Sequence, residues 1–160
     1  MGSSCNNRDL RRGIDENKAT KIDIQLVYGQ WLKYTVRTKI ELRKGIFVGE
    51  YKGRVCNEIS EHSQYVIKLS GGKETCYICG KKEGNICIFI YHSCYPNLVV
   101  KQMSVDGRVR VGFYAKRYIP PNYILTYDYR IYGRDLWFTC ECGAKDCVSN
   151  KKRASKIRKT

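Results

Sequence analysis

Near its C-terminal end the chain reads Cys140-Glu141-Cys142-Gly143-Ala144-Lys145-Asp146-Cys147. Three thiols this close together on a polar segment are more typical of a metal site than of a packed core, and Gly143 permits a tight turn between them. Tetrahedral zinc needs a fourth soft ligand, with each sulfur about 2.3 Å from the metal. Cys94 is the candidate, so we predict a zinc site formed by Cys94, Cys140, Cys142 and Cys147.

The remaining cysteines give a weaker signal. A second metal site at Cys76, Cys79 and Cys87 is disfavoured, because strand alternation would turn Cys76 and Cys79 to opposite faces. The sequence starts without a recognisable secretory signal, so we expect the protein to be intracellular. A reducing intracellular compartment keeps thiols reduced. We therefore expect buried free thiols at these positions rather than disulfides.

Upstream of the cysteine cluster, short runs of β-forming residues alternate with turn residues. They occupy residues 22–26, 34–38, 46–51, 65–67, 98–100, 108–111 and 124–129. Asp106-Gly107 is a strong signal for a two-residue hairpin turn, and only Asn57–Gln64 is suited to a short helix. At 160 residues, the chain is expected to form one mainly β domain of small sheets with little helix.

The charge of the chain indicates its partners. Thirty Lys and Arg residues face fifteen Asp and Glu residues, which gives a net charge of +15, and the last ten residues carry six positive charges and no negative ones. Such an excess favours polyanions such as nucleic acid or chromatin, and the basic tail is compatible with nuclear import. No apolar run approaches the roughly 18 residues that span a bilayer, so we expect no membrane association.

Three further motifs accompany the cysteine cluster in a fixed order. They are Lys44-Gly45-Ile46-Phe47-Val48-Gly49-Glu50-Tyr51-Lys52-Gly53, His92-Ser93-Cys94-Tyr95-Pro96-Asn97 and Leu125-Thr126-Tyr127-Asp128-Tyr129. Together the four motifs resemble the SET domain of the protein-lysine methyltransferase family, followed by its post-SET zinc loop. The resemblance covers roughly Ile22 to Val148 and lacks the cysteine-rich pre-SET region. It divides the chain into a polar leader (1–21), a SET domain (22–135), a post-SET zinc loop (136–148) and a basic tail (149–160).

The resemblance implies a fold and an activity. The expected fold is a SET-type β-clip of small curved sheets, with a C-terminal pseudoknot and a post-SET loop held by a structural zinc ion. The expected reaction transfers a methyl group from S-adenosylmethionine to a lysine, the two entering a narrow channel from opposite faces. The expected substrate is a histone tail or another basic nuclear protein, with nucleosomal DNA bound through the basic surface and tail, in the nucleus on the chromosome.

The resemblance also assigns roles to aromatic residues. Tyr129 matches the catalytic tyrosine at the methyl-transfer point. Tyr127 matches a catalytic position occupied by Phe or Tyr in the family, where Tyr restricts the number of methyl groups added. Tyr65 resembles a further channel tyrosine. The residues predicted to bind the methyl donor are Tyr34, Tyr91, His92 and Tyr129.

The donor-binding motifs depart from the family pattern. The usual Gly-x-Gly is Lys33-Tyr34-Thr35, the usual Asn before His92 is Tyr91, and an Arg common three residues earlier is Ile88. The usual Gly-Glu-Glu before Leu-Thr is Asn122-Tyr123-Ile124. Two hypotheses follow: a divergent enzyme with a reshaped pocket, or a catalytically inactive SET-derived module that binds chromatin or a protein. A basic zinc-containing nucleic-acid binder unrelated to SET would leave the shared motifs unexplained.

Overall fold

The computed structural model describes residues 24–27, 34–58, 65–70, 75–131, 136 and 138–150. This part of the chain is mainly β, as predicted, and none of its helices is long and apolar enough to cross a membrane. Its elements are β1 (Ile24–Val27), β2 (Thr35–Thr38), β3 (Phe47–Tyr51), β4 (Arg54–Cys56), β5 (Val66–Lys68), β6 (Tyr77–Cys79), the 3-10 helix η1 (Ile86–Phe89), β7 (Tyr91–His92), β8 (Leu98–Val105), β9 (Arg108–Ala115) and β10 (Thr126–Tyr127).

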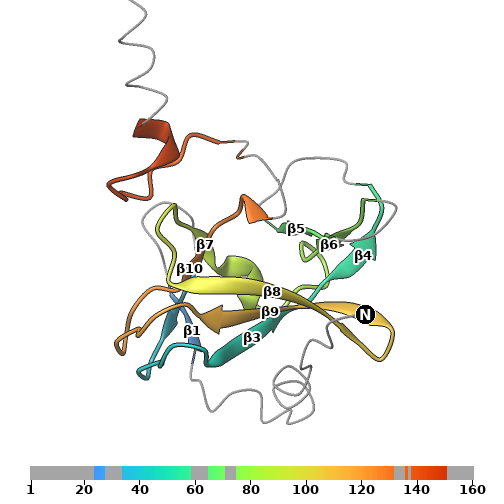
Figure 1. Cartoon of the computed structure of the whole chain (residues 1–160), viewed down its shortest axis with the longest axis horizontal. Coiled ribbons are helices and arrows are strands. Elements are labelled where there is room, and N and C mark those ends of the chain that lie inside the picture. The colour runs from blue at the N-terminus through green and yellow to red at the C-terminus, as the bar shows by residue number, and fades with distance from the viewer. Residues whose placement is uncertain are drawn as a thin grey trace, which may run out of the picture.

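The longest strands, β8 and β9, form an antiparallel hairpin that pairs with β3 in the order β3-β9-β8 (Figure 1). The hairpin turns at Asp106 and Gly107, whose φ angles of 50° and 74° are both positive. Positive φ at both central residues is the geometry that an Asp-Gly turn supplies, and its twist matches that of the flanking strands. The predicted hairpin is therefore confirmed, with Val105 opposite Arg108.

The hydrophobic core lies between this sheet and the smaller sheet β4-β6-β5. The last five residues of β9 are all buried. Val111, Phe113 and Ala115 face the main core, and Tyr114 packs in a second, smaller cluster with Val105. Phe113 is the central example, because its ring contacts Tyr51 of β3 at 6.2 Å and Tyr127 of β10 at 4.9 Å between ring centroids. The core packing thereby fixes the position of one of the predicted catalytic tyrosines.

The two motifs expected at a chain crossing do meet. Strands β7 and β10 pair in parallel, with His92 opposite Tyr127, and the Ser93 N–H donates to the Tyr127 carbonyl at 3.0 Å. The buried Asn97 side chain adds two bonds, donating to the Ile124 carbonyl at 2.7 Å and accepting from the Thr126 N–H at 2.8 Å. These contacts hold segments about thirty residues apart in the sequence side by side.

The structure departs from the expectation of free thiols at one pair. Cys56 of β4 and Cys79 of β6 form a disulfide. The antiparallel register places Cys56 opposite Tyr77 and Cys79 opposite Arg54, so the two cysteines are diagonal neighbours across the strands. This proximity depends on a register that spacing alone does not reveal.

Some predicted segments lie outside the described residues, and some short elements of the structure were not predicted. The predicted helix Asn57–Gln64 lies largely outside the described residues, as do the leader and the end of the basic tail. Strands β4 and β7 and the 3-10 helix η1 were not predicted. Each is only two to four residues long, and its pairing or packing comes from distant parts of the chain.

Candidate functional site

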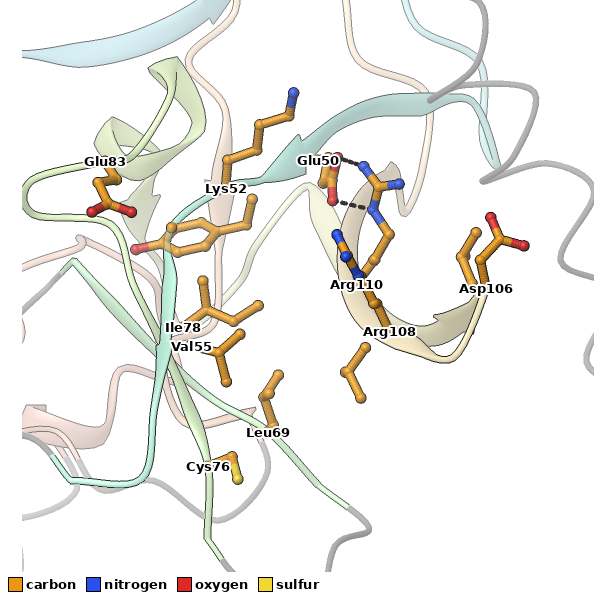
Figure 2. Close-up of a pocket in the computed structure, with 14 residues that line it drawn as sticks. Glu50, Lys52, Val55, Leu69, Cys76, Ile78, Glu83, Asp106, Arg108 and Arg110 are labelled. Carbon is orange, nitrogen blue, oxygen red and sulfur yellow. Dashed lines mark hydrogen bonds and ion pairs between the residues drawn. The ribbon is translucent and has the colours of Figure 1, made fainter.

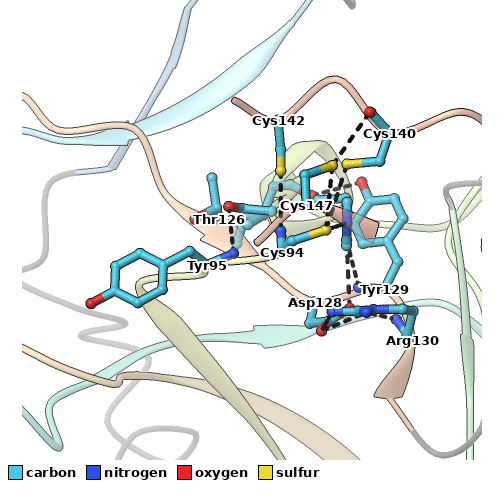
Figure 3. Close-up of polar contacts among 12 residues, drawn as sticks. Cys94, Tyr95, Thr126, Asp128, Tyr129, Arg130, Cys140, Cys142 and Cys147 are labelled. Carbon is cyan, nitrogen blue, oxygen red and sulfur yellow. Dashed lines mark hydrogen bonds and ion pairs between the residues drawn. The ribbon is translucent and has the colours of Figure 1, made fainter. Parts of the chain in front are cut away.

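The four predicted metal ligands come together beside the crossing (Figure 3). The Sγ atoms of Cys94, Cys140, Cys142 and Cys147 all lie within 4.8 Å of one another. From Cys94 the sulfur of Cys140 is 3.8 Å away and that of Cys147 is 3.9 Å away. A tetrahedron with metal–sulfur bonds of about 2.3 Å has sulfur–sulfur edges of about 3.8 Å, so the cluster has the dimensions of a zinc site.

The backbone around the cluster favours a thiolate at Cys142, whereas burial raises the pKa of the Cys94 and Cys140 thiols. The Cys94 N–H donates to the Cys142 sulfur at 3.4 Å, and Gly143 adopts a positive φ of 72° in the turn that follows. Burial acts to raise the pKa of the Cys142 thiol, but hydrogen bonds from the N–H groups of Cys94 and Ala144 and from the thiols of Cys140 and Cys94 outweigh burial and lower this pKa to about 7. A thiol that ionises near neutral pH is ready to bind a metal cation.

His92 lies between the cysteine cluster and the C-terminal segment. Its side chain is 3% exposed, its Nδ1 accepts the Tyr129 N–H at 3.0 Å, and its Nε2 lies 3.3 Å from the Cys94 sulfur. Burial lowers the pKa of His92 to about 4, although Asp128 acts in the opposite direction. The ring is therefore neutral at pH 7, and its 3.6 Å approach to the Asp128 carboxylate is not an ion pair.

Tyr129 occupies the buried centre of the site. Its ring lies 4.7 Å from that of Tyr127 and 5.4 Å from that of His92, and its hydroxyl donates to the Ile90 carbonyl at 2.9 Å. Both tyrosines are at most 5% exposed. The two predicted catalytic tyrosines are thus adjacent, with the hydroxyl of Tyr129 held by the chain just before β7.

The residues around Tyr129 are fixed by an ion pair. Arg130 donates through Nε to one oxygen of Asp128 at 2.8 Å and through Nη2 to the other at 2.5 Å (Figure 3). Burial acts to raise the pKa of Asp128, but its hydrogen bonds with Arg130 outweigh this and hold the pKa below its ordinary value. This clamp restrains the backbone on both sides of the tyrosine.

The other two predicted donor-binding residues, Tyr34 and Tyr91, lie against η1 and on β7. Tyr34 is 48% exposed, and its ring packs edge-on against that of Phe89 of η1, with 6.1 Å between ring centroids. The next residue, Thr35, is buried, and its hydroxyl has no hydrogen-bond partner within the described part of the chain. Tyr91 is half-buried on β7, and the predicted channel residue Tyr65 also packs against Phe89, at 6.2 Å.

Two residues that the sequence interpretation missed belong to this site. Phe138 contacts the rings of His92 at 5.9 Å and Tyr129 at 6.3 Å, and Ile90 supplies the carbonyl that holds Tyr129. The position of Phe138 two residues before Cys140 is a usable signal, because a metal-bound loop would carry it toward Cys94. The role of Ile90 rests on its backbone and leaves no such signal.

A separate groove of about 820 Å³ lies between the β4–β6 side and the β8–β9 hairpin (Figure 2). Apolar side chains line it, including Val55 and Leu69, and at its edge Arg110 makes a two-pronged ion pair with Glu50, with both N–O distances at 2.6 Å. None of the predicted catalytic, donor-binding or metal-binding residues lines this groove.

Curated relatives resemble the chain over most of its length. The histone-lysine N-methyltransferase ASHR3 of Arabidopsis thaliana is 32% identical over 90% of this chain and 29% of its own length. The histone-lysine N-methyltransferase ash1 of Drosophila melanogaster is 29% identical over 91% of this chain and 7% of its own. For the human histone-lysine N-methyltransferase SETD2 the values are 27%, 91% and 6%. The chain thus spans less than a third of each of these relatives.

Solved structures share the fold, and one family model matches the chain. KRYPTONITE in complex with mCHG DNA and SAH superposes with a TM-score of 0.69 at 27% identity, covering 84% of this chain and 30% of that one. The methyltransferase domain of human SETMAR superposes with a TM-score of 0.68 at 25% identity, covering 80% and 57%. The SET domain model matches residues 33–130, more than half of the sequence. The chain therefore belongs to the SET domain family.

Proposed function

We propose that this chain is an S-adenosylmethionine-dependent protein-lysine N-methyltransferase domain that acts on a histone tail or another basic nuclear protein on chromatin. The observation that carries the proposal is Tyr129, whose buried hydroxyl is fixed by the Ile90 carbonyl beside the Cys94 cluster. The relatives support the reaction, because they are histone-lysine N-methyltransferases, and a KRYPTONITE structure contains an H3(1–15) peptide and SAH.

The substrate amine sets the demand on the site. A lysine has a pKa near 10.4, so reaching its neutral form at pH 7 costs about 4–5 kcal/mol. Among the described residues, the imidazole beside Tyr129 is that of His92, and it is bonded at both nitrogens, so it is not available as a base. We infer that the site acts by excluding water and aligning the amine, with the released proton passing to solvent.

Tyr129 and Tyr127 align the amine in this mechanism. The Tyr129 hydroxyl donates its hydrogen to the Ile90 carbonyl, so toward a substrate amine its oxygen can act only as a hydrogen-bond acceptor, a role that would orient the nitrogen lone pair. Tyr127 packs between Phe113 and Tyr129 and forms a rigid wall. We propose that this wall limits the number of methyl groups that each lysine receives.

The cysteine cluster fits a zinc ion, on the sulfur–sulfur distances given above. Cys94, Cys140, Cys142 and Cys147 would supply all four ligands, which leaves no open position for chemistry. We propose that the metal is structural and pins the post-SET loop (136–148) to Cys94, and that the SET domain extends over residues 22–135.

The donor side offers groups that fit S-adenosylmethionine. The buried Thr35 hydroxyl, without a partner in the described residues, is a polar group left for a ligand, and Phe138 and His92 present aromatic edges at the crossing. When bound, S-adenosylmethionine supplies a sulfonium-activated methyl group whose carbon–sulfur bond breaks as the lysine nitrogen bonds the carbon. Tyr34, Tyr91, His92 and Tyr129 are the residues that we propose line its site.

A second part of the proposal concerns DNA. The loops at 39–46 and 116–124 lie together near β1 (Figure 1), because Leu42 and Ile119 exchange two backbone hydrogen bonds. They form a basic edge, which we define as Lys39, Arg43, Lys44, Lys116 and Arg117. Only Glu41 opposes these five charges within the two loops. The guanidinium of Arg117 also stacks on the exposed ring of Tyr95 at 4.5 Å, and we propose that this edge contacts nucleosomal DNA.

One observation favours the alternative of a catalytically inactive SET-derived binding module. Lys33 and Thr35 stand where the family carries Gly, and Tyr91 stands where it carries Asn. A side chain occupies space that a glycine leaves open. An inactive module would keep the zinc cluster and the fold while losing affinity for the methyl donor.

Calorimetric titration of the zinc-loaded protein with S-adenosylmethionine separates the two functions. Binding in the micromolar range, followed by methylation of a lysine on nucleosomes, supports the enzyme. No heat of binding from a folded, zinc-loaded sample would overturn the enzyme proposal and favour the inactive module.

A further inference from the structure

The His92 side chain connects two parts of the site that are separate in the sequence. It contacts the Tyr129 backbone through one ring nitrogen and the Cys94 sulfur through the other, at 3.0 and 3.3 Å. The ring is enclosed by the edges of Tyr129 and Phe138, so it cannot turn away to solvent.

The direction of each hydrogen bond follows from the chemistry of the partners. A backbone N–H can only donate, so Nδ1 accepts from Tyr129 and carries no hydrogen. The neutral imidazole then has its hydrogen on Nε2, which points at Cys94. A metal-bound cysteine is a thiolate that can accept this hydrogen bond.

We propose that His92 is a positioning residue whose side chain donates to the Cys94 thiolate and fixes the Tyr129 backbone, linking the metal cluster to the tyrosine at the methyl-transfer point. This inference rests on the proposed function, but it assigns the imidazole a role other than donor binding. It makes the orientation of Tyr129 dependent on the same ring that stabilises the metal site.

The direct test is to determine which ring nitrogen of His92 carries the hydrogen, and the small number of histidines makes this measurement simple. His62 and His92 are the only two histidines in the sequence. In the ¹⁵N-labelled, zinc-loaded protein we expect His92 to show hydrogen on Nε2 alone, with a slowly exchanging N–H. The His62→Gln variant removes the other histidine and assigns the signals. A hydrogen on Nδ1, or a ring that samples both nitrogens, would overturn the proposal.

Two matched variants separate the two bonds. In His92→Asn the amide oxygen takes the place of Nδ1, whereas in His92→Gln the amide N–H takes the place of Nε2. We expect His92→Asn to bind zinc about tenfold more weakly than His92→Gln in a chelator competition, because only Gln keeps a donor to Cys94. We expect His92→Gln to lose about tenfold more kcat than His92→Asn at saturating zinc, with faster hydrogen exchange at the Tyr129 amide.

The expected opposite effects of the two variants, on zinc affinity in one and on kcat in the other, distinguish this role from general destabilisation. If both variants lose zinc affinity and kcat in parallel, His92 is a packing residue and the link is wrong. The nitrogen assignment, zinc affinity and amide exchange need no methyl transfer. A protein that passes these three tests but methylates no substrate would overturn the proposed function and leave the His92 link standing.

Discussion

At the scale of single residues, the Tyr129 hydroxyl connects the packing of the core to the proposed chemistry. Replacing Tyr129 with Phe keeps the ring that packs on Tyr127 and His92 and removes only the hydroxyl. We expect kcat on nucleosomes to fall about 100-fold, because the amine loses the group that orients it. The free energy of unfolding should fall by only about 1–2 kcal/mol, since one buried carbonyl, that of Ile90, loses its donor.

Methylation rates and urea denaturation of the same samples measure the two quantities. Tyr123→Phe is the matched control, because Tyr123 is 52% exposed and its hydroxyl belongs to none of the site contacts described above. An unchanged kcat in Tyr129→Phe, or an equal fall in both variants, would remove Tyr129 from the reaction.

Single residues also mark how far the sequence could predict the site. The spacing of Cys140, Cys142 and Cys147 carries the metal signal directly, and these sulfurs meet Cys94 as expected. The Ile90 carbonyl carries no signal, because any residue offers a carbonyl and only the path of the chain decides where it points. The role of a side chain can be predicted where its chemical type allows few functions. The role of a backbone group cannot be predicted in this way, because every residue carries the same one.

At the scale of elements, the parallel pair β7–β10 depends on a side-chain clamp. Asn97 supplies one donor and one acceptor to the segment that contains β10, and it is 2% exposed. Asn97→Ala leaves the Ile124 carbonyl and the Thr126 N–H without these partners, so we expect a loss of about 2–4 kcal/mol in the free energy of unfolding.

Gln102→Ala is the control, and denaturation in urea is the measurement. Gln102 also bonds twice to the backbone, at the Ser70 N–H and carbonyl, but in an exposed position. Water can replace these bonds, so this variant should lose less than about 1 kcal/mol. Equal losses in the two variants would show that the clamp is not what holds the crossing together.

The elements differ in how well the sequence could predict them. The hairpin β8–β9 is predictable because Asp106-Gly107 fixes its turn locally. Strand β7 has only two residues and exists because residues 126–127, far along the chain, pair with it. The β-strand propensity of two residues cannot predict so short a strand. The proximity of Cys56 and Cys79 likewise depends on the pairing of strands β4 and β6, which the local sequence does not reveal.

At the scale of the whole molecule, the proposed zinc ion should stabilise one region and leave another intact. Residues 138–150 contact the rest of the protein through the cysteine cluster and the ring of Phe138. The main hydrophobic core is built from the sheets and contains none of the four ligands. We expect removal of zinc by a chelator to raise hydrogen exchange strongly across 138–150 and only slightly in β3, β8 and β9.

Hydrogen exchange followed by mass spectrometry checks this prediction, and re-addition of zinc should restore the protection. Loss of protection in β8 and β9 to the same extent as in residues 138–150 would mean that the metal holds the entire fold.

The net charge of +15 acts on the whole molecule, and it bears on how a basic domain meets a basic histone tail. A positively charged domain repels a positively charged tail, so we expect the basic residues to bind the phosphates of nucleosomal DNA instead. Replacing Lys39, Arg43 and Lys44 of the basic edge with Gln should weaken nucleosome binding and lower the slope of log affinity against log salt by about 2–3, since each phosphate contact contributes about 0.9.

Replacing Arg54, Lys81 and Lys82 with Gln is the matched control, because it removes the same charge from exposed positions near β4. This control should leave the slope nearly unchanged, and binding to a free histone-tail peptide should show little salt dependence of this sign. Fluorescence anisotropy at several salt concentrations measures all of these slopes. If the two triple variants lower the slope equally, the attraction comes from the net charge alone and not from the basic edge. If nucleosomes and free histone tails show the same salt dependence, the charge does not act by binding DNA.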